Sequence, residues 1–334
     1  MLRKLAFIFV FVLAFQFLAS AQTTRHFTFH YAFTVKDVPA GQRVRVWFPA
    51  AHSDEYQHVR VLSSTGDLTL KKTRESRFEN EIYFAEASKA KGGDLHFEIV
   101  YDVVRYEHLT LGLLHPRLQN ASLDKKDTQL YLTADKLVPV TGLPAELAAQ
   151  VTAGKDSDLA KARGIYEYVF ANMKYDKSGT GWGHGDVLYA CNAKKGNCTD
   201  FHSLFIAMAR SQRIPARFEI GFPLPSDKTS GEIAGYHCWA EFFNPQNGWV
   251  PVDISEAWKR QEKKDYFFGA NDANRIQFST GRDLKLNPAQ QGEPLNYFVY
   301  PYAEIDGKEY PRVDMHFSFA DANENPAQAR VSEY

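Results

Sequence analysis

The sequence predicts an α+β protein in which an antiparallel β-sandwich is followed by a domain of helices and antiparallel strands. Two observations support this prediction. Apolar and polar residues alternate through most of residues 25–137, which is typical of strands with one buried face. Near Pro139 the apolar spacing changes to that of helices. With 334 residues, the chain is long enough for two domains.

The first residues have the order of a secretory signal. Arg3 and Lys4 precede an apolar run over residues 5–18, and small residues follow it. Because this run is short for a membrane span, we expect residues 1–21 to be a signal peptide and the mature chain to begin near Gln22. A retained membrane anchor is the alternative. The protein is expected to be exported, either periplasmic or secreted, with no membrane span after signal removal.

The first domain, residues 22–138, is predicted from short alternating segments. The two long segments are 27–35 and 95–103, and shorter ones lie at 44–48 and 82–84. Several short strands separated by turn residues predict an antiparallel sandwich. No catalytic signature is visible in it, so we expect it to pack against the next domain.

The second domain, residues 139–285, begins with helical spacing. One short helix is predicted to start at Pro144, and a second is capped by Ser157 or Asp158. The following segment, 178–186, contains alternating glycines, which indicate a loop that approaches other backbone closely.

Residues 286–334 are predicted to form a C-terminal β-hairpin extension and a loosely held tail. Segments 297–304 and 313–319 alternate as strands do. Asp306 and Gly307 between them are a strong hairpin-turn signal.

Charge and cysteine content narrow the function classes. The 39 Lys and Arg residues nearly balance the 40 Asp and Glu residues, so no basic excess attracts nucleic acid or an anionic membrane surface. We therefore expect no nucleic-acid partner. The three cysteines are Cys191, Cys198 and Cys238, and an odd number leaves at least one thiol unpaired within the chain.

Cys198 is expected in the first turn of a helix. Apolar residues recur at helical spacing over 201–208, Asn197 suits the N-cap position, and Asp200 completes a sequence that resembles a capping box. Unpaired N–H groups and the positive dipole end at a helix start favour a thiolate. A thiol with a lowered pKa is a nucleophile.

A hairpin is predicted on either side of the turn at residues 244–248. Opposed residues in such a hairpin have position numbers with a constant sum. An even sum, about 490 or 492, places His237 and Asp253 on one face within hydrogen-bonding reach, whereas an odd sum separates them. The sequence alone does not choose between these registers. Cys238 is expected to point to the opposite face and to lie outside this site.

Together these segments resemble the transglutaminase-like superfamily. The motifs are Gly-Asn-Cys-Thr-Asp at Cys198, Ile-Pro-Ala-Arg after it, His-Cys-Trp-Ala-Glu at His237, and Gly-Trp-Val-Pro-Val before Asp253, within roughly residues 160–256. The resemblance implies a papain-like core, in which a helix bearing the cysteine packs on an antiparallel sheet. It also implies that Cys198 attacks an amide or ester carbonyl, His237 moves the proton, and Asp253 orients the histidine.

The same resemblance implies an oxyanion site and a reaction class. The backbone N–H of Cys198 is one donor candidate, and Trp182, in the glycine-rich loop, is a second. The chain lacks the calcium loop and the paired C-terminal sandwich domains of animal transglutaminases. This difference favours a peptidase or amidase of bacterial type, acting on peptide or protein, with cell-wall peptide as one candidate. No cofactor or metal is expected.

Several alternatives remain open. The protein could be a protein-glutamine transglutaminase that transfers the acyl group to an amine, or a catalytically silent module that binds peptide or glycan. His202 could support the site from along the helix or face solvent. A zinc site from Cys191, Cys198, His202 and Cys238 matches no familiar spacing. A Cys191–Cys238 disulfide would leave Cys198 free.

Overall fold

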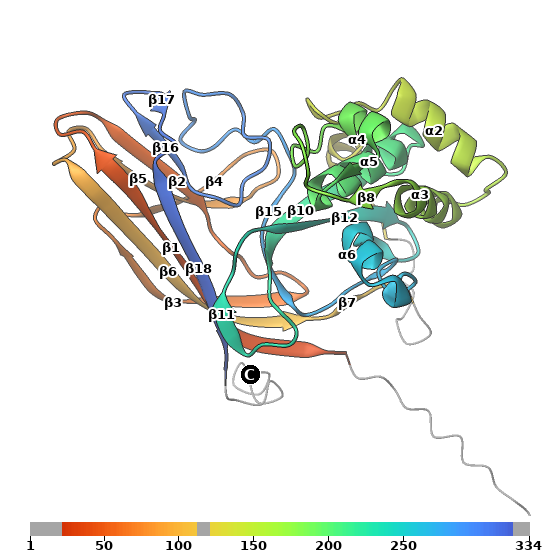
Figure 1. Cartoon of the computed structure of the whole chain (residues 1–334), viewed down its shortest axis with the longest axis horizontal. Coiled ribbons are helices and arrows are strands. Elements are labelled where there is room, and N and C mark those ends of the chain that lie inside the picture. Colours follow the sequence, from red (N-terminus) through yellow and green to blue (C-terminus); the bar gives the residue numbers. More distant parts are fainter. Residues whose placement is uncertain (1–21, 112–120, 323–334) are drawn as a thin grey trace, which may run out of the picture.

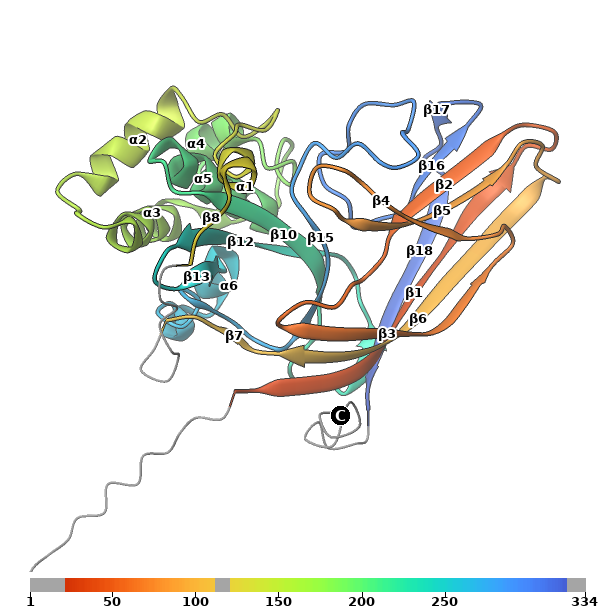
Figure 2. The same ribbon diagram turned by 180° about the vertical axis from the view of Figure 1, so that it is seen from behind.

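The computed structural model describes residues 22–111 and 121–322, and the predicted signal peptide and the end of the tail lie outside them. A β-sandwich occupies one end of the molecule, and helices gathered over a smaller sheet occupy the other (Figures 1 and 2). The predicted α+β architecture is confirmed. Within the described ranges, no helix is long and apolar enough to cross a membrane.

Two five-stranded antiparallel sheets form the sandwich, in the orders β11-β18-β1-β6-β3 and β17-β16-β2-β5-β4. The first sheet consists of β1 (Thr24–Val38), β3 (Gln57–Gly66), β6 (Gly93–Tyr106), β11 (Ser230–Glu232) and β18 (Val313–Asp321). The second consists of β2 (Val44–Pro49), β4 (Lys71–Arg74), β5 (Glu81–Ala87), β16 (Tyr302–Ile305) and β17 (Lys308–Glu309). Every second residue of β1 is buried, as the alternation predicts.

The C-terminal strands do not pair as predicted. The turn at Asp306 and Gly307 is confirmed, but it joins β16 to the short β17. β18 instead pairs along β1, from Val35↔Val313 to Phe27↔Asp321, in the opposite sheet. The segment thus supplies β16 and β17 to one sheet and β18 to the other, so its two main strands do not pair with each other. Edge strands of both sheets can accept a partner from distant sequence, which local alternation does not reveal.

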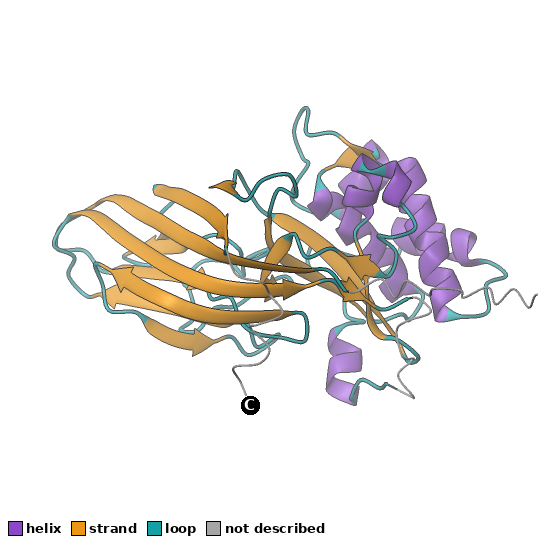
Figure 3. Cartoon of the chain, turned by 90° about the horizontal axis from the view of Figure 1, so that it is seen from below, coloured by secondary structure: helices purple, strands orange, loops and turns teal. Residues whose placement is uncertain are grey.

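The helical end of the molecule is built on a four-stranded antiparallel sheet, in the order β13-β12-β10-β15. These strands are β10 (Ala216–Pro223), β12 (His237–Asn244), β13 (Gly248–Val252) and β15 (Arg275–Thr280). The helices are α1 (Lys125–Leu130), α2 (Leu143–Thr152), α3 (Asp158–Asn172), α4 (Val187–Ala193), α5 (Cys198–Ser211) and α6 (Ile254–Lys259), with a 3-10 turn at Gln261–Lys263. Figure 3 shows them clustered away from the long sandwich strands.

Two short pairings complete the described fold. β7 (His108–Leu109) pairs with β14 (Ala270–Asn271), so the end of the sandwich is linked to the segment that follows α6. β8 (Lys174–Tyr175) lies parallel to β9 (Lys195–Gly196) directly before α5.

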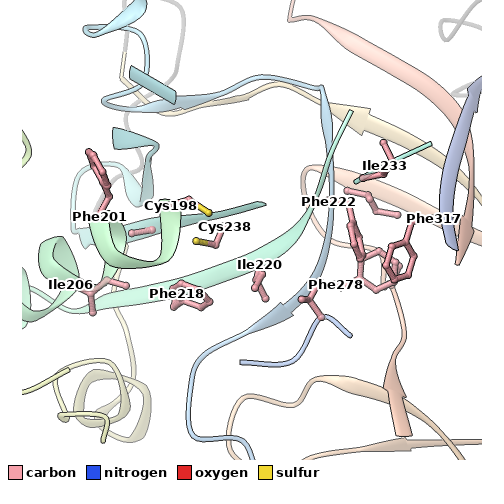
Figure 4. Packing of buried hydrophobic residues seen from close by; sticks show 14 of the residues in the cluster. Cys198, Phe201, Ile206, Phe218, Ile220, Phe222, Ile233, Cys238, Phe278 and Phe317 are labelled. Atoms are coloured by element: carbon pink, nitrogen blue, oxygen red, sulfur yellow. The ribbon is translucent and has the colours of Figure 1, made fainter. Parts of the chain in front are cut away.

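A shared aromatic core joins the sandwich to the four-stranded sheet. The ring centroids of Phe222 on β10 and Phe317 on β18 are 4.4 Å apart, and Phe278 on β15 lies 5.5 Å from Phe222 (Figure 4). All three side chains are buried in one continuous cluster. Burying each such ring contributes roughly 1.5–3 kcal/mol, so the sandwich holds the sheet firmly in place.

Candidate active site

The start of α5 has the geometry that its sequence predicts. Cys198 is the first helical residue, and the Asn197 side chain accepts a hydrogen bond from the Thr199 N–H at 2.9 Å. The Asp200 carboxylate accepts one from the Asn197 N–H at 2.9 Å, which completes the capping box. Cys198 is only 2% exposed. Its sulfur therefore lies in a dry environment at the positive end of a helix.

Asp200 also anchors the glycine-rich loop against this helix. Its carboxylate accepts the N–H groups of Gly183 at 2.7 Å and Gly185 at 3.0 Å. The approach is so close that a Cβ on Gly185 would collide with the side chains of Ser203 and Thr199 on α5. The loop therefore does need glycine for close packing, but it packs against side chains of α5 and not, as predicted, against other backbone. One buried carboxylate thus fixes the loop and the turn that bears Cys198 together.

Replacing Asp200 with Ala should leave three backbone N–H groups of the site without an acceptor. Because each buried unsatisfied donor costs about 1–3 kcal/mol, we expect the free energy of unfolding to fall by roughly 3 kcal/mol or more. Urea denaturation would measure this change. The matched control is Asp186→Ala at the cap of α4, where only Leu188 and Tyr189 lose an acceptor; its expected cost is about 1 kcal/mol. Equal losses in the two variants would contradict the anchoring role.

The β12–β13 hairpin has the even register. Ala240 pairs with Val252 and Phe242 with Val250, so paired numbers sum to 492 in both cases. His237 and Asp253 consequently share a face, and His237 Nε2 lies 2.7 Å from Asp253 Oδ2. The structure thus has the even register, which the sequence alone left open and which the pairing of His237 with Asp253 requires.

Asp253 is surrounded by donors. It is fully buried and caps α6, where Oδ1 accepts the Glu256 N–H at 3.1 Å. Its Oδ2 also accepts Arg275 Nη1 at 3.0 Å. Burial alone would raise the pKa of this carboxyl, but the charges of His237 and Arg275 and the His237 hydrogen bond hold it well below its usual range. Asp253 is therefore ionised.

Arg275 was not identified from the sequence. It is 2% exposed on β15, its Nη2 lies 3.3 Å from Asp272, and its guanidinium lies 4.9 Å from the Trp239 ring centroid. No local motif marks this residue, because only the pairing of β15 with β10 brings it to Asp253.

The thiol of Cys198 and the imidazole of His237 shift each other's pKa in opposite directions. Burial would raise the pKa of Cys198, but hydrogen bonds with Cys238 and His237, and the charge of His237, bring it well below its usual value. Burial would lower the pKa of His237, but Asp253 and the Cys198 hydrogen bond raise it to about 9. Since Asp253 occupies His237 Nε2, Nδ1 is left for Cys198. The arrangement favours a thiolate–imidazolium pair at neutral pH.

The expectation that Cys238 lies outside the site is wrong. Its Sγ lies 3.7 Å from Thr199 Oγ1 and 3.8 Å from His202 Nδ1, both in the first turns of α5. Neighbouring residues of a strand do point to opposite faces. His237, however, is the first residue of β12, and both it and Cys238 reach Cys198. The site is not confined to one face of the sheet, because Cys198 lies on a helix that packs against that sheet.

His202 supports the site and does not face solvent. It is fully buried, and Nε2 accepts the Ile254 N–H at 3.0 Å, directly after Asp253. Burial lowers the pKa of this imidazole to about 4, so it is neutral at physiological pH. His202 therefore joins α5 to the start of α6 without adding a charge.

The remaining sequence candidates are Trp182, the Cys191–Cys238 disulfide and the zinc site. The Trp182 indole N–H donates to the Gly179 carbonyl at 3.1 Å within its own loop, and is thus already engaged. All three cysteines lie in the described part of the chain and are free, so no Cys191–Cys238 disulfide is formed. Within the described ranges, no group of His, Cys, Asp or Glu is arranged to hold a metal ion.

A cavity of about 490 Å³ opens beside His237. One wall is the mainly apolar segment after β10, which includes Leu224 and Ile233. The other wall carries the ion-paired side chains of Glu256, Arg260 and Arg275. The cavity is large enough for part of an extended chain, as substrate pockets are.

Comparisons with known proteins agree with this geometry. The family model described as "Transglutaminase-like superfamily" matches residues 145–254, which contain Cys198, His237 and Asp253. An uncharacterized protein of Haemophilus influenzae is 30% identical over 307 residues, covering 81% of this chain and 83% of that protein. This chain belongs to the transglutaminase-like superfamily.

Two further comparisons found a solved structure and a partial relative. The crystal structure of a proposed cysteine protease from Cytophaga hutchinsonii has a TM-score of 0.60 at 16% identity, and covers 91% of this chain and 92% of that one. The two chains therefore share a fold over nearly their whole lengths. The uncharacterized protein YebA of Bacillus subtilis is 26% identical over 152 residues, covering 40% of this chain but 21% of YebA.

Proposed function

We propose that this protein is an exported thiol enzyme that hydrolyses amide bonds of peptides or proteins through an acyl-thioester on Cys198. The observation that carries the proposal is the arrangement Cys198–His237–Asp253, in which the carboxylate holds His237 Nε2 at 2.7 Å and leaves Nδ1 for the sulfur. Such an arrangement activates a nucleophile and supplies the proton for the leaving group.

In the proposed mechanism, the Cys198 thiolate adds to the substrate carbonyl. The backbone N–H of Cys198, at the start of α5, is our candidate for stabilising the oxyanion that forms. The His237 imidazolium then donates its proton to the leaving amine, and the acyl-thioester remains. Neutral His237 next accepts a proton from water, whose oxygen attacks the thioester and releases the acid. Asp253 keeps the imidazole oriented during both steps.

The cavity beside His237 fits the amine side of the substrate. Its lining includes His237 but not Cys198. Since the histidine exchanges protons with both the leaving amine and the incoming water, these groups must lie on the histidine side of the sulfur. We therefore place the leaving amine and the attacking water in this cavity. Export is proposed from the order of basic, apolar and small residues at the N-terminus.

Alkylation tests the nucleophile without knowledge of the substrate. Native protein treated with limiting iodoacetamide at about pH 6 should be labelled at Cys198, because few ordinary thiols are ionised at that pH. His237→Ala should slow this labelling on the order of tenfold, since the thiolate loses its counter-charge. Mass spectrometry of peptides would locate the label. Labelling at Cys191 in place of Cys198, or only after denaturation, would contradict the proposal.

The fate of the acyl group separates hydrolysis from transfer. Wild-type protein should release a free carboxyl product from a peptide library, and it should not attach a labelled primary amine to glutamine-containing protein. Cys198→Ala should abolish product release. Efficient amine incorporation would instead identify a transglutaminase. Biological activity that persists unchanged in Cys198→Ala would indicate a binding module.

A further inference from the structure

A second thiol lies directly beside the nucleophile. The Cys238 sulfur, on β12, and the Cys198 sulfur, on α5, lie side by side between helix and sheet (Figure 4). Cys238 Sγ approaches Thr199 Oγ1 at 3.7 Å and His202 Nδ1 at 3.8 Å, the residues one and four positions after Cys198. Both thiols are free and almost completely buried. Catalysis as proposed above does not require Cys238.

The thiols of Cys198 and Cys238 have pKa values that are shifted in opposite directions. Burial, reinforced by the hydrogen bond to Cys198, raises the pKa of Cys238 well above its usual value, whereas that of Cys198 is lowered. Cys238 is thus a protonated thiol that donates toward a thiolate. A thiolate is the form that peroxides oxidise, and a nearby thiol is what converts the product into a disulfide.

We propose that Cys198 and Cys238 form a site of reversible oxidation, at which a hydroperoxide converts the nucleophile into a Cys198–Cys238 disulfide. This modification goes beyond the proposed function. It rests only on the Cys198 thiolate that the proposed function also uses, and not on the identity of the substrate.

The reaction occurs in two balanced steps. The Cys198 thiolate attacks the terminal oxygen of the hydroperoxide, the O–O bond breaks, and Cys198 becomes a sulfenic acid. The departing alkoxide or hydroxide takes the proton of the His237 imidazolium and leaves as an alcohol or as water. Cys238 sulfur then attacks the Cys198 sulfur and the S–O bond breaks. The Cys238 proton leaves with the hydroxyl as water. A dithiol reductant returns both residues to thiols by exchange.

The third cysteine provides an internal control. Cys191 lies on α4, and burial raises the pKa of its thiol to about 11. It is bonded to neither of the other two sulfurs. It therefore lacks the thiolate that the reaction needs.

The disulfide would protect the nucleophile. A sulfenic acid without a neighbouring thiol is oxidised further to the sulfinic acid, which dithiols do not reduce. Trapping by Cys238 stops oxidation at a stage that can be reversed. A peroxide pulse should therefore switch wild-type protein off reversibly.

The test compares wild type with Cys238→Ser and Cys191→Ala after treatment with hydrogen peroxide. In wild type and in Cys191→Ala, non-reduced digests should contain the Cys198 and Cys238 peptides joined, about 2 Da below their summed mass. Iodoacetamide labelling of Cys198 should be lost and should return fully with dithiothreitol. Serine preserves the size and the hydrogen-bond donor at position 238, and the labelling of Cys238→Ser after peroxide is compared with the labelling of the same variant before peroxide. After peroxide, Cys238→Ser should gain about 32 Da at Cys198, and dithiothreitol should not restore its labelling by iodoacetamide.

Other results of the peroxide test would contradict either this inference or the proposed function. If untreated wild type is labelled at Cys198 but peroxide yields no joined peptide, or yields one that contains Cys191, this inference is overturned and the proposed function stands. Full recovery of Cys198 labelling in oxidised Cys238→Ser after dithiothreitol would also overturn this inference. If Cys198 is not labelled in untreated wild type, the proposed function itself fails. Cys238→Ala, which removes both the thiol and the hydrogen-bond donor, is a second variant. Its Cys198 labelling should also fail to recover after peroxide and dithiothreitol.

Discussion

Replacing Asp253 with Asn should lower kcat/KM for peptide hydrolysis by about a hundredfold or more. The Asp253 charge and hydrogen bond are what raise the pKa of His237 to about 9 against the opposing effect of burial. Asparagine removes the charge, so the pKa of His237 should fall toward or below its ordinary value of about 6.5. The imidazolium that protonates the leaving amine would then be scarce at neutral pH.

The pH profile distinguishes this effect from simple misfolding. In wild type, the activity should extend toward about pH 9, where His237 loses its proton. In Asp253→Asn, this alkaline limb should move down by about two pH units or more. Asp272→Asn is the matched control, because Asp272 also binds Arg275 but does not touch His237. An unchanged alkaline limb in Asp253→Asn would contradict the assigned role.

Replacing Arg275 with Met should lower the free energy of unfolding by about 3–5 kcal/mol. The guanidinium is 2% exposed and binds Asp253 at 3.0 Å and Asp272 at 3.3 Å. Methionine fills much of the volume but leaves one fully buried and one largely buried carboxylate without their shared cation. The control is Arg60→Met, which removes a 2.8 Å pair with Asp102 in which Arg60 is 74% exposed. It should cost less than about 1 kcal/mol.

The stability lost in Arg275→Met should depend on pH, and the direction of this dependence follows from the pKa of Asp253. The folded-state pKa of Asp253 lies below its unfolded value, so its stabilising contribution is present above the unfolded value of about 3.9 and is lost as the pH falls through the folded value. The difference between wild type and Arg275→Met should therefore be largest near neutral pH and should shrink in acid. Urea titrations at several pH values would measure it. A difference that is constant from neutral pH to about pH 2 would contradict the ion-pair explanation.

Features set by local sequence were predictable. The N-cap at Asn197, the capping box with Asp200 and the hairpin turn at residues 244–248 follow from neighbouring residues, and the structure has all of them. The choice between odd and even register was not predictable, because it depends on which face of β12 packs against α5. The register alone then decides whether His237 and Asp253 meet.

Features set by distant contacts were not predictable. Arg275 reaches Asp253 only because β15 lies at the edge of a sheet whose order is not the order of the sequence. Cys238 was assigned correctly to the opposite strand face from its neighbour. Its place beside Cys198 depends on how a helix crosses that strand, which alternation does not encode. The Trp182 candidate came from the family resemblance, and its indole N–H is bound within its own loop.

The pairing of β18 with β1 has a consequence for synthesis of the protein. Some 290 residues separate Phe27 from its partner Asp321. On the ribosome, β1 therefore emerges long before the strand that covers its edge, and the whole Cys198 domain is made in between. Until then, an uncovered strand edge is open to association with other chains. Nascent chains should thus depend on holding chaperones until the last strand arrives, and truncation before β18 should yield aggregates instead of a smaller folded protein.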